Sequence, residues 1–298
     1  MAVLSGLLGN HGSTAADWPA HRHDVQRSAV TDEKLSCPLQ PVWRYVCDQP
    51  PRPAWSEPPR KINQMDFDYA PAPVIADGLV CFGSTADDTI RALDAATGTE
   101  RWHFIAGGPV RFAPQIDSKR VYAASDDGRV YCLDAASGKP VWIFNAAPAN
   151  EMYIGNRRMI SRWPIRTGAL VRDGIVYAVA GSWATEGTYV YALDAKTGKV
   201  IWCNDSGGLL HGAGAPRWRI ADPHSGDSAF SGPTPQGALL ASRDCLIVPM
   251  GLNSPAIYSL ATGGLLKYDA NGSGGTWFTL DGSFRYHFAG DLTGAGTT

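Results

Sequence analysis

One phrase occurs three times in this chain and restricts what the chain can fold into. It reads small residue or Cys, Leu, Asp, two variable residues, Thr or Ser, Gly, three variable residues and Trp. The copies occupy 92–102, 132–142 and 192–202. An alternating apolar run precedes each copy and another follows it, which is typical of two strands joined by a tight turn. The phrase therefore predicts a repeated β-hairpin.

Three positions of the phrase have structural roles. The Asp can accept hydrogen bonds from turn amides, and the Gly supplies the left-handed backbone that the turn needs. The Trp buries a large ring, and its indole N–H still requires an acceptor. A ring at the same place in every unit is suited to docking one unit on the next. The expected docking residues are Asp94, Gly98, Trp102, Asp134, Gly138, Trp142, Asp194, Gly198 and Trp202.

The spacing of the copies predicts four-stranded units. Trp102 and Trp142 are 40 residues apart, near the period of propeller blades, and Trp142 and Trp202 are 60 apart, which is one blade plus an insertion of 20. The stretch 111–145 offers four short apolar strands separated by turns, as a β-meander blade requires. A fourth unit is degenerate, because Tyr268 stands at the Trp position. The expected blades are 72–104, 111–145, 167–204 and 232–269, with partial units at both ends.

The phrase resembles the tryptophan-docking motif of the pyrroloquinoline-quinone (PQQ) type propeller repeat, Ala-x-Asp-x-x-x-Gly-x-x-x-Trp, and the resemblance covers about residues 17–290. That family includes quinoprotein dehydrogenases and many cofactor-free relatives. The resemblance implies an all-β propeller of four-stranded antiparallel blades, about four of them complete, in one domain at 17–298. Because such propellers usually close with more blades, and open sheets expose hydrogen-bonding edges, we expect a truncated part of a longer propeller. Closure with a second copy is the alternative.

Composition and the first residues bear on partners and location. A net charge of −2 gives no electrostatic reason to expect nucleic acid or an anionic membrane as a partner. No stretch approaches the ~20 apolar residues of a membrane helix. Residues 1–16 read as a clipped signal peptide or a disordered leader, with small residues before Asp17 but no basic start. Together with the resemblance, this predicts a periplasmic or secreted bacterial protein.

Two long insertions, 145–166 and 205–230, interrupt the repeats, and long loops on a rigid scaffold usually carry binding sites. Both are rich in Arg and Trp, a pairing that suits an anionic or planar ligand. If both rise from one face they form a single rim; the alternative is a pair of solvated loops. The candidate ligand- or partner-binding residues, one of them from a shorter insertion at 181–187, are Arg157, Arg158, Arg162, Trp163, Arg166, Trp183, Arg217, Trp218 and Arg219.

Two further segments have a structural interpretation. The Pro-rich stretch 48–73 is expected to be a loop over one propeller face, with Asp66 and Asp68 solvated. The opening segment 17–28 contains His21 and His23, which could suggest a metal site. Its position in the chain favours instead a segment pinned to a sheet edge.

Two functions compete. The first is a non-catalytic scaffold that binds a protein, peptide or carbohydrate through the insertions. The alternative is a PQQ- and Ca²⁺-dependent quinoprotein dehydrogenase of the alcohol or sugar type, or a fragment of one. That chemistry needs Arg or Lys on the quinone carboxylates, carboxylate and amide oxygens on Ca²⁺, and an Asp base. Glu151, Asn156 and Glu186 do not form such a set in the sequence, so no catalytic, cofactor-binding or metal residue is assigned and enzymatic activity stays open.

Overall fold

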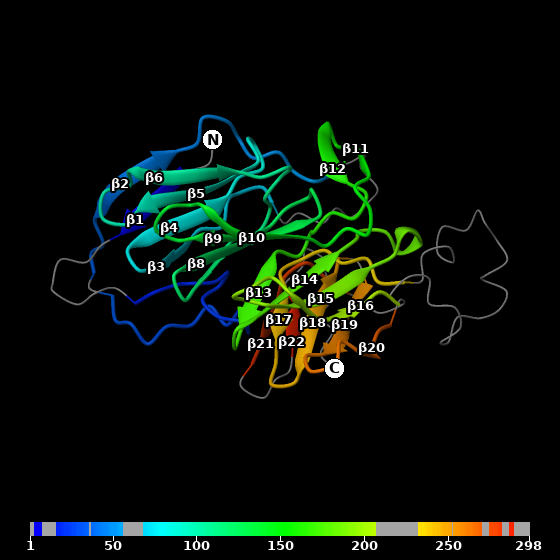
Figure 1. The fold of residues 1–298 in the computed structure, drawn as a ribbon. Helices are drawn as coiled ribbons and strands as arrows, with labels where there is room; N and C mark the ends of the chain where they lie inside the picture. The colour runs from blue at the N-terminus through cyan, green and yellow to red at the C-terminus, as the bar shows by residue number, and fades with distance from the viewer. Residues whose placement is uncertain are drawn as a thin grey trace, which may run out of the picture.

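A computed structural model gives the fold and describes residues 3–7, 16–35, 37–55, 68–206, 232–251, 253–269, 274–281 and 286–288, of which 3–7 and 286–288 are described as backbone only. The described part is all-β, apart from one turn of 3₁₀ helix at Ala184–Glu186 (Figure 1). None of the helices in this part is long and apolar enough to cross a membrane.

Four sheets of four antiparallel strands form the body of the molecule, as expected for propeller blades. In each sheet the strands follow one another in chain order, so every sheet is a meander. The sixteen strands are β3 (Val74–Ala76), β4 (Leu79–Gly83), β5 (Thr89–Asp94) and β6 (Glu100–Ile105); β7 (Gln115–Asp117), β8 (Arg120–Ala124), β9 (Arg129–Asp134) and β10 (Pro140–Asn145); β13 (Ala169–Arg172), β14 (Ile175–Ala180), β15 (Tyr189–Asp194) and β16 (Val200–Asn204); and β17 (Leu240–Ala241), β18 (Cys245–Met250), β19 (Asn253–Ser259) and β20 (Leu265–Lys267).

Three two-stranded sheets accompany the four blades. β1 (Val3–Leu7) pairs with β2 (Pro41–Val46), and β21 (Phe278–Leu280) pairs with β22 (Tyr286–Phe288). The third pair, β11 (Met152–Gly155) and β12 (Arg158–Ser161), lies inside the insertion 145–166. This insertion, expected to be an irregular loop, is therefore a β-hairpin.

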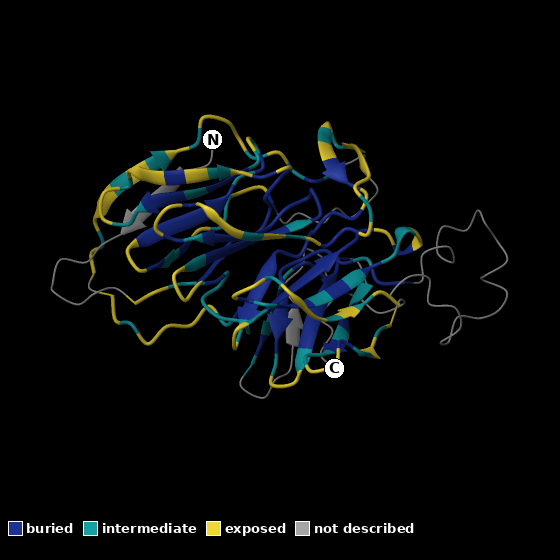
Figure 2. Ribbon diagram, viewed as in Figure 1, coloured by how far each residue is buried: buried dark blue, intermediate teal, exposed yellow. Residues whose placement is uncertain are grey.

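Burial falls from the inner strands to the outer strands of each blade (Figure 2). β4, β8 and β14 are almost wholly buried, whereas β6, β10 and β16 alternate exposed and covered side chains. The inner strands read as continuous apolar runs because both of their faces are covered by neighbouring sheets. The core therefore lies between adjacent blades and not inside any one of them.

A Trp closes each seam between neighbouring blades by lying on a Gly of the next blade. Trp102 packs on Gly138 so closely that a Cβ there would lie 2.6 Å from the ring, and the indole N–H donates to the Ala135 carbonyl at 2.9 Å. Gly138 has a φ of +69°, so the absence of a side chain permits both its left-handed backbone and the close approach of the ring. The same arrangement pairs Trp43 with Gly98, Trp142 with Gly198 and Trp202 with Gly263.

The opening segment runs along the inner edges of sheets that are far apart in the chain. Trp18 exchanges two backbone hydrogen bonds with Ile75 of β3, and Pro19 accepts one from Ile116 of β7. Val25 accepts one from Ala241 of β17, and Gln26 accepts one from Leu280 of β21. We call residues 17–29 the hub segment. It is pinned to sheet edges, as its position in the sequence suggested.

Blade-to-blade connections and the β4–β5, β8–β9 and β14–β15 turns leave the sheets at the same end, because successive strands alternate in direction. We call this end the connection face. Every insertion that the structure describes rises from it, and so does the stretch between β2 and β3. The scaffold thus collects its irregular segments on one side.

Candidate functional site

The hairpin β11–β12 projects from the connection face (Figure 1). Its four cross-strand pairs run from Met152 opposite Ser161 to Gly155 opposite Arg158. Asn156 and Arg157 form the turn with φ angles of 43° and 65°, both left-handed, as in the two-residue turns that suit the twist of a hairpin. The Asn156 side chain also donates to the Pro53 carbonyl at 2.8 Å, which ties the hairpin tip to the stretch before β3.

Two of the candidate arginines of this insertion, Arg158 and Arg162, already have partners in this chain, whereas Arg157 is exposed in the turn. Arg158 pairs with Asp88 of the β4–β5 turn and donates to the Ala86 carbonyl at 3.0 Å. Arg162 pairs with Glu151 at 2.8 Å and, more closely, with Glu186. Hydrogen bonds to Glu186 and Glu151 raise the pKa of the Arg162 guanidinium.

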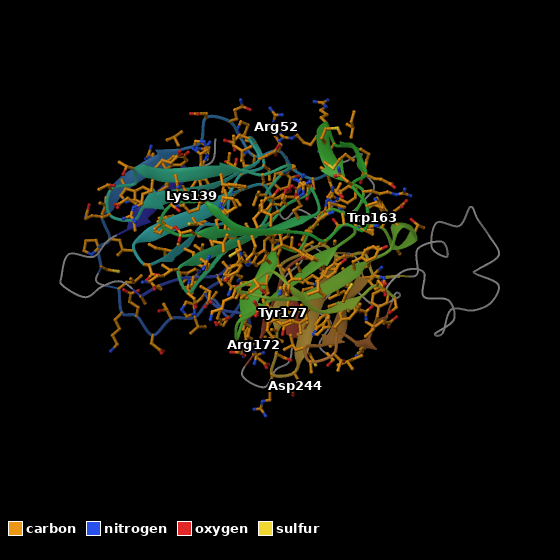
Figure 3. All side chains as sticks on the ribbon, viewed as in Figure 1. Arg52, Lys139, Trp163, Arg172, Tyr177 and Asp244 are labelled. Carbon is orange, nitrogen blue, oxygen red and sulfur yellow. The ribbon has the colours of Figure 1, made fainter. Side chains whose placement is uncertain are left out.

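Trp163 fastens the base of the hairpin to the neighbouring blade (Figure 3). It is buried, its indole N–H donates to the Glu186 carbonyl, and its ring meets Tyr189 edge-on at 6.4 Å between centroids. The Arg162 guanidinium lies over the same ring, 5.4 Å from its centre. Trp163 therefore joins the two insertions 145–166 and 181–187.

A cavity of about 440 Å³ opens between these two insertions. Trp183 is 39% exposed there and meets the ring of Trp55 edge-on, with centroids 6.0 Å apart. We call this space the rim cavity. It is lined by Glu151, Met152, Tyr153, Arg162, Trp183 and Glu186.

Beside the rim cavity lies a buried ionic cluster. Arg111 pairs with Asp68 and, at 2.7 Å, with Asp126; all three side chains are at most 2% exposed. Arg166 is also buried; its Nε lies 3.7 Å from Asp126 and its guanidinium lies 5.0 Å from the centre of the Trp55 ring. Burial raises the pKa of Asp68, against the opposing effect of Arg111, and burial lowers the pKa of Arg166.

The burial of Asp68 in this cluster shows that one prediction from the sequence was wrong. Asp68 was expected to be solvated, but it is 3% exposed. It is buried because the Ala54 amide donates to it at 2.8 Å and Arg111 supplies the opposite charge, so its carboxylate oxygens keep hydrogen bonds without water. Asp66, the other carboxylate of that pair, lies outside the residues that the structure describes.

The described residues do not fit a PQQ- and Ca²⁺-binding site. Within them, no group of three or more His, Cys, Asp or Glu side chains is placed to hold a metal ion. The buried carboxylates Asp68 and Asp126 are engaged by Arg111, so they do not provide the open oxygen set that Ca²⁺ needs. The candidates Arg217, Trp218 and Arg219 lie outside the described part, and with them most of the insertion 205–230.

A family model described as outer membrane protein assembly factor BamB matches residues 41–202 and 127–271, which together cover well over half of the 298 residues. The chain belongs to this PQQ-repeat β-propeller family.

Relatives of this PQQ-repeat propeller carry different activities in their names. A serine/threonine-protein kinase, AfsK of Streptomyces griseus, is 38% identical over 147 residues, which are 47% of this chain and 16% of the kinase. The dehydrogenase subunit of a quinone-dependent alcohol dehydrogenase from Gluconacetobacter polyoxogenes is 31% identical over 143 residues, 44% of this chain and 19% of that protein. The chain thus matches under a fifth of the length of either relative, and the shared repeat does not determine the activity.

A solved structure supports the same architecture. The quinohemoprotein alcohol dehydrogenase of Comamonas testosteroni superposes with a TM-score of 0.61 at 20% identity, over 88% of this chain and 42% of that one. At this identity the likeness concerns the fold. This PQQ-repeat propeller therefore shares its blade arrangement with part of a larger propeller enzyme.

Sequence reasoning missed the acidic half of the site. Glu151 and Glu186 were considered only as calcium ligands, and Asp126 was not singled out. Each is placed by a contact with an Arg at least 11 positions away along the chain, which local pattern does not encode. The only available signal was the presence of acidic residues inside Arg-rich insertions.

Proposed function

We propose that this propeller is a non-catalytic scaffold whose connection face binds a protein or peptide partner through the hairpin β11–β12 and Trp183. The single observation that carries the proposal is the set of large apolar side chains that the hairpin exposes. Ile154 is 74% exposed and Met159 53%, and Met152 and Tyr153 follow at 37% and 39%. Four such side chains on one projecting hairpin favour a docking surface over an ordinary surface turn.

The hairpin is also held in place before any partner arrives. The Asn156 contact at its tip, the Arg158–Asp88 pair along it and the Trp163 anchor at its base fix three separate points. A fixed recognition element loses little conformational freedom on binding, so more of the contact energy is retained as affinity. This rigidity is the second support for a docking role.

The proposal is tested by panning a displayed library of random short peptides on the wild-type protein. The enriched peptides are then measured against the double variant I154S/M159S. Burying two such side chains is worth roughly 1.5–3 kcal/mol each, so we expect this variant to weaken binding at least about tenfold. A matched control, I143S/I201S, removes side chains that are 48% and 53% exposed on the outer strands β10 and β16.

Retained affinity in I143S/I201S together with loss in I154S/M159S supports docking at the hairpin. Equal affinity of I154S/M159S and wild type rejects it. A second arm addresses the dehydrogenase alternative: the protein receives PQQ and Ca²⁺, and dye-linked oxidation of alcohols and sugars is followed. We expect no turnover above the buffer rate, and sustained turnover would replace the scaffold proposal with an enzyme.

A further inference from the structure

The lining of the rim cavity has a net negative charge, although the insertion 145–166 that forms most of it is rich in Arg. Its charged lining residues are Glu151, Glu186 and Arg162, two carboxylates against one guanidinium. The other hairpin arginine with an ion pair, Arg158, is neutralised by Asp88. The buried cluster beside the cavity is balanced as well, because two aspartates accompany two arginines there. One negative charge is therefore in excess among the residues that line the cavity; Arg157, exposed at the hairpin tip, is not one of them.

The carboxylates keep hydrogen-bonding capacity that Arg162 does not use. Arg162 donates one hydrogen bond from Nη1 to Oε2 of Glu151 and another from Nε to Oε2 of Glu186. Among the described residues no hydrogen bond is recorded to Oε1 of either glutamate, and their side chains are 53% and 27% exposed. An incoming donor can thus reach one oxygen of each carboxylate.

Aromatic rings complete the lining. Tyr153 and Trp183 are each 39% exposed on the cavity. A cation within about 6 Å of such a ring is attracted by its electron-rich face, most strongly for Trp. Two carboxylates and two aromatic rings around about 440 Å³ fit one long cationic side chain, whereas an anion would meet the excess negative charge.

We propose that the rim cavity binds a Lys or Arg side chain of the partner segment, with the exposed apolar side chains of the hairpin contacting the residues beside it. This inference rests on the proposed docking function and names the chemistry of the partner. The ammonium or guanidinium group lies between Glu151 and Glu186, and its aliphatic stem lies along Tyr153 and Trp183.

The first experiment needs no variant of the cavity charges. The protein is labelled with 5-fluorotryptophan, the Trp183 fluorine resonance is assigned by its loss in W183F, and three probes are titrated in turn. N-acetyl-lysine methylamide is expected to shift this resonance in a saturable manner. Because salt screens the attraction between charges, the affinity for this probe is expected to fall when salt is raised from about 0.05 to about 0.5 M. N-acetyl-norleucine methylamide, which lacks the charge, and N-acetyl-glutamate methylamide are expected to shift it much less. An equal response to norleucine, or a stronger one to glutamate, overturns the inference.

Two variants of opposite charge sharpen the test. E151Q/E186Q removes the negative charge and is expected to lower the affinity for the lysine probe about tenfold. R162Q removes the competing cation and is expected to raise the affinity for the lysine probe about threefold. Affinities that move in the same direction in both variants, or in neither, contradict a charge-selective site.

Failure here is distinguishable from failure of the scaffold proposal. If the selected peptides lose affinity for I154S/M159S but the lysine probe behaves like norleucine, the hairpin docks a partner by apolar contact alone. If the lysine probe behaves as expected while I154S/M159S binds the peptides normally, the cavity is cation-selective but the hairpin is not the docking surface.

Discussion

The glycine at each blade seam is required by two independent constraints, its left-handed backbone and the indole ring that lies on it. Gly78 and Gly138 separate these constraints, because their φ angles are +70° and +69°. An added Cβ at Gly78 meets no atom within 4 Å, whereas at Gly138 it would lie 2.6 Å from Trp102. The pair provides an internal measurement of what the ring contact contributes.

We predict that G138A lowers the free energy of unfolding more than G78A does. Both variants incur about 1–2 kcal/mol for a left-handed non-Gly residue, and G138A adds about 1–3 kcal/mol of overpacking against the indole. Denaturant unfolding followed by intrinsic fluorescence measures both values. Equal destabilisation would mean that the ring moves away without cost and that the seam is not tightly packed.

His21 is a half-buried base whose charge the fold opposes. Its Nε2 is buried without a hydrogen-bond partner among the described residues, and its ring lies 4.9 Å from that of Trp277. Burial, aided by Arg27 and Arg22, lowers its pKa from 6.5 to about 3. The folded state therefore binds this proton less readily than the unfolded state does.

The resulting pH dependence has a definite sign. A depressed pKa gives stability that is complete above about pH 6.5 and is lost as the pH falls toward 3. The loss amounts to roughly 1 kcal/mol per pH unit within that window. We predict that H21Q, which cannot titrate, shows a flatter decline than wild type when unfolding is measured from pH 7 down to about pH 4. Parallel curves for the two proteins would show that His21 does not couple to folding.

Among the elements, the hub segment depends on one buried cation. Arg27 is 3% exposed and donates to the carbonyls of Leu239 at 2.9 Å, His21 at 2.9 Å and Asp24 at 3.1 Å. Burial lowers its pKa to about 10, which still leaves it charged at neutral pH. The side chain thus ties the segment to Leu239, the residue before β17, and closes the segment's own turn.

We predict that R27A destabilises the protein by about 3–5 kcal/mol, because it leaves buried carbonyls without donors. R27K keeps the charge but not the forked donors, so it is expected to fall between R27A and wild type. Hydrogen exchange should show lost protection in β3 and β17 in R27A. The surface variant K139A serves as control, and the same exchange pattern in K139A and R27A would contradict the role of the segment.

Elements with local signals could be predicted from the sequence, and those held by distant contacts could not. In the second blade four short strands were expected within 111–145, because apolar runs alternate there with turns, and β7 to β10 lie within these bounds. The hairpin β11–β12 was missed, because its turn is Asn156-Arg157 and lacks the Gly that marks such turns. The buried cluster joins Asp68 to Arg111 across 43 positions, a pairing that no local pattern encodes.

At the scale of the whole molecule, the repeat determines the framework and the insertions determine what is particular to this chain. Each blade contacts its neighbours through one seam, so stability is expected to accumulate from one seam to the next, as in repeat proteins. The connection face gathers the hairpin, the rim cavity and the buried cluster on one side of that framework. Recognition can therefore diverge among relatives while the blades stay the same.

The hub segment also has a consequence for biosynthesis. Its residues are synthesised more than two hundred positions before two of their hydrogen-bond partners, Ala241 and Leu280. The hub segment must wait without these partners until they have been synthesised, and loop closure over such separations slows folding. Nascent chains stalled before Leu280 should consequently lack the hydrogen bonds that join the hub segment to the last sheets. During this stage of synthesis, apolar surface would be exposed and chaperones could bind it.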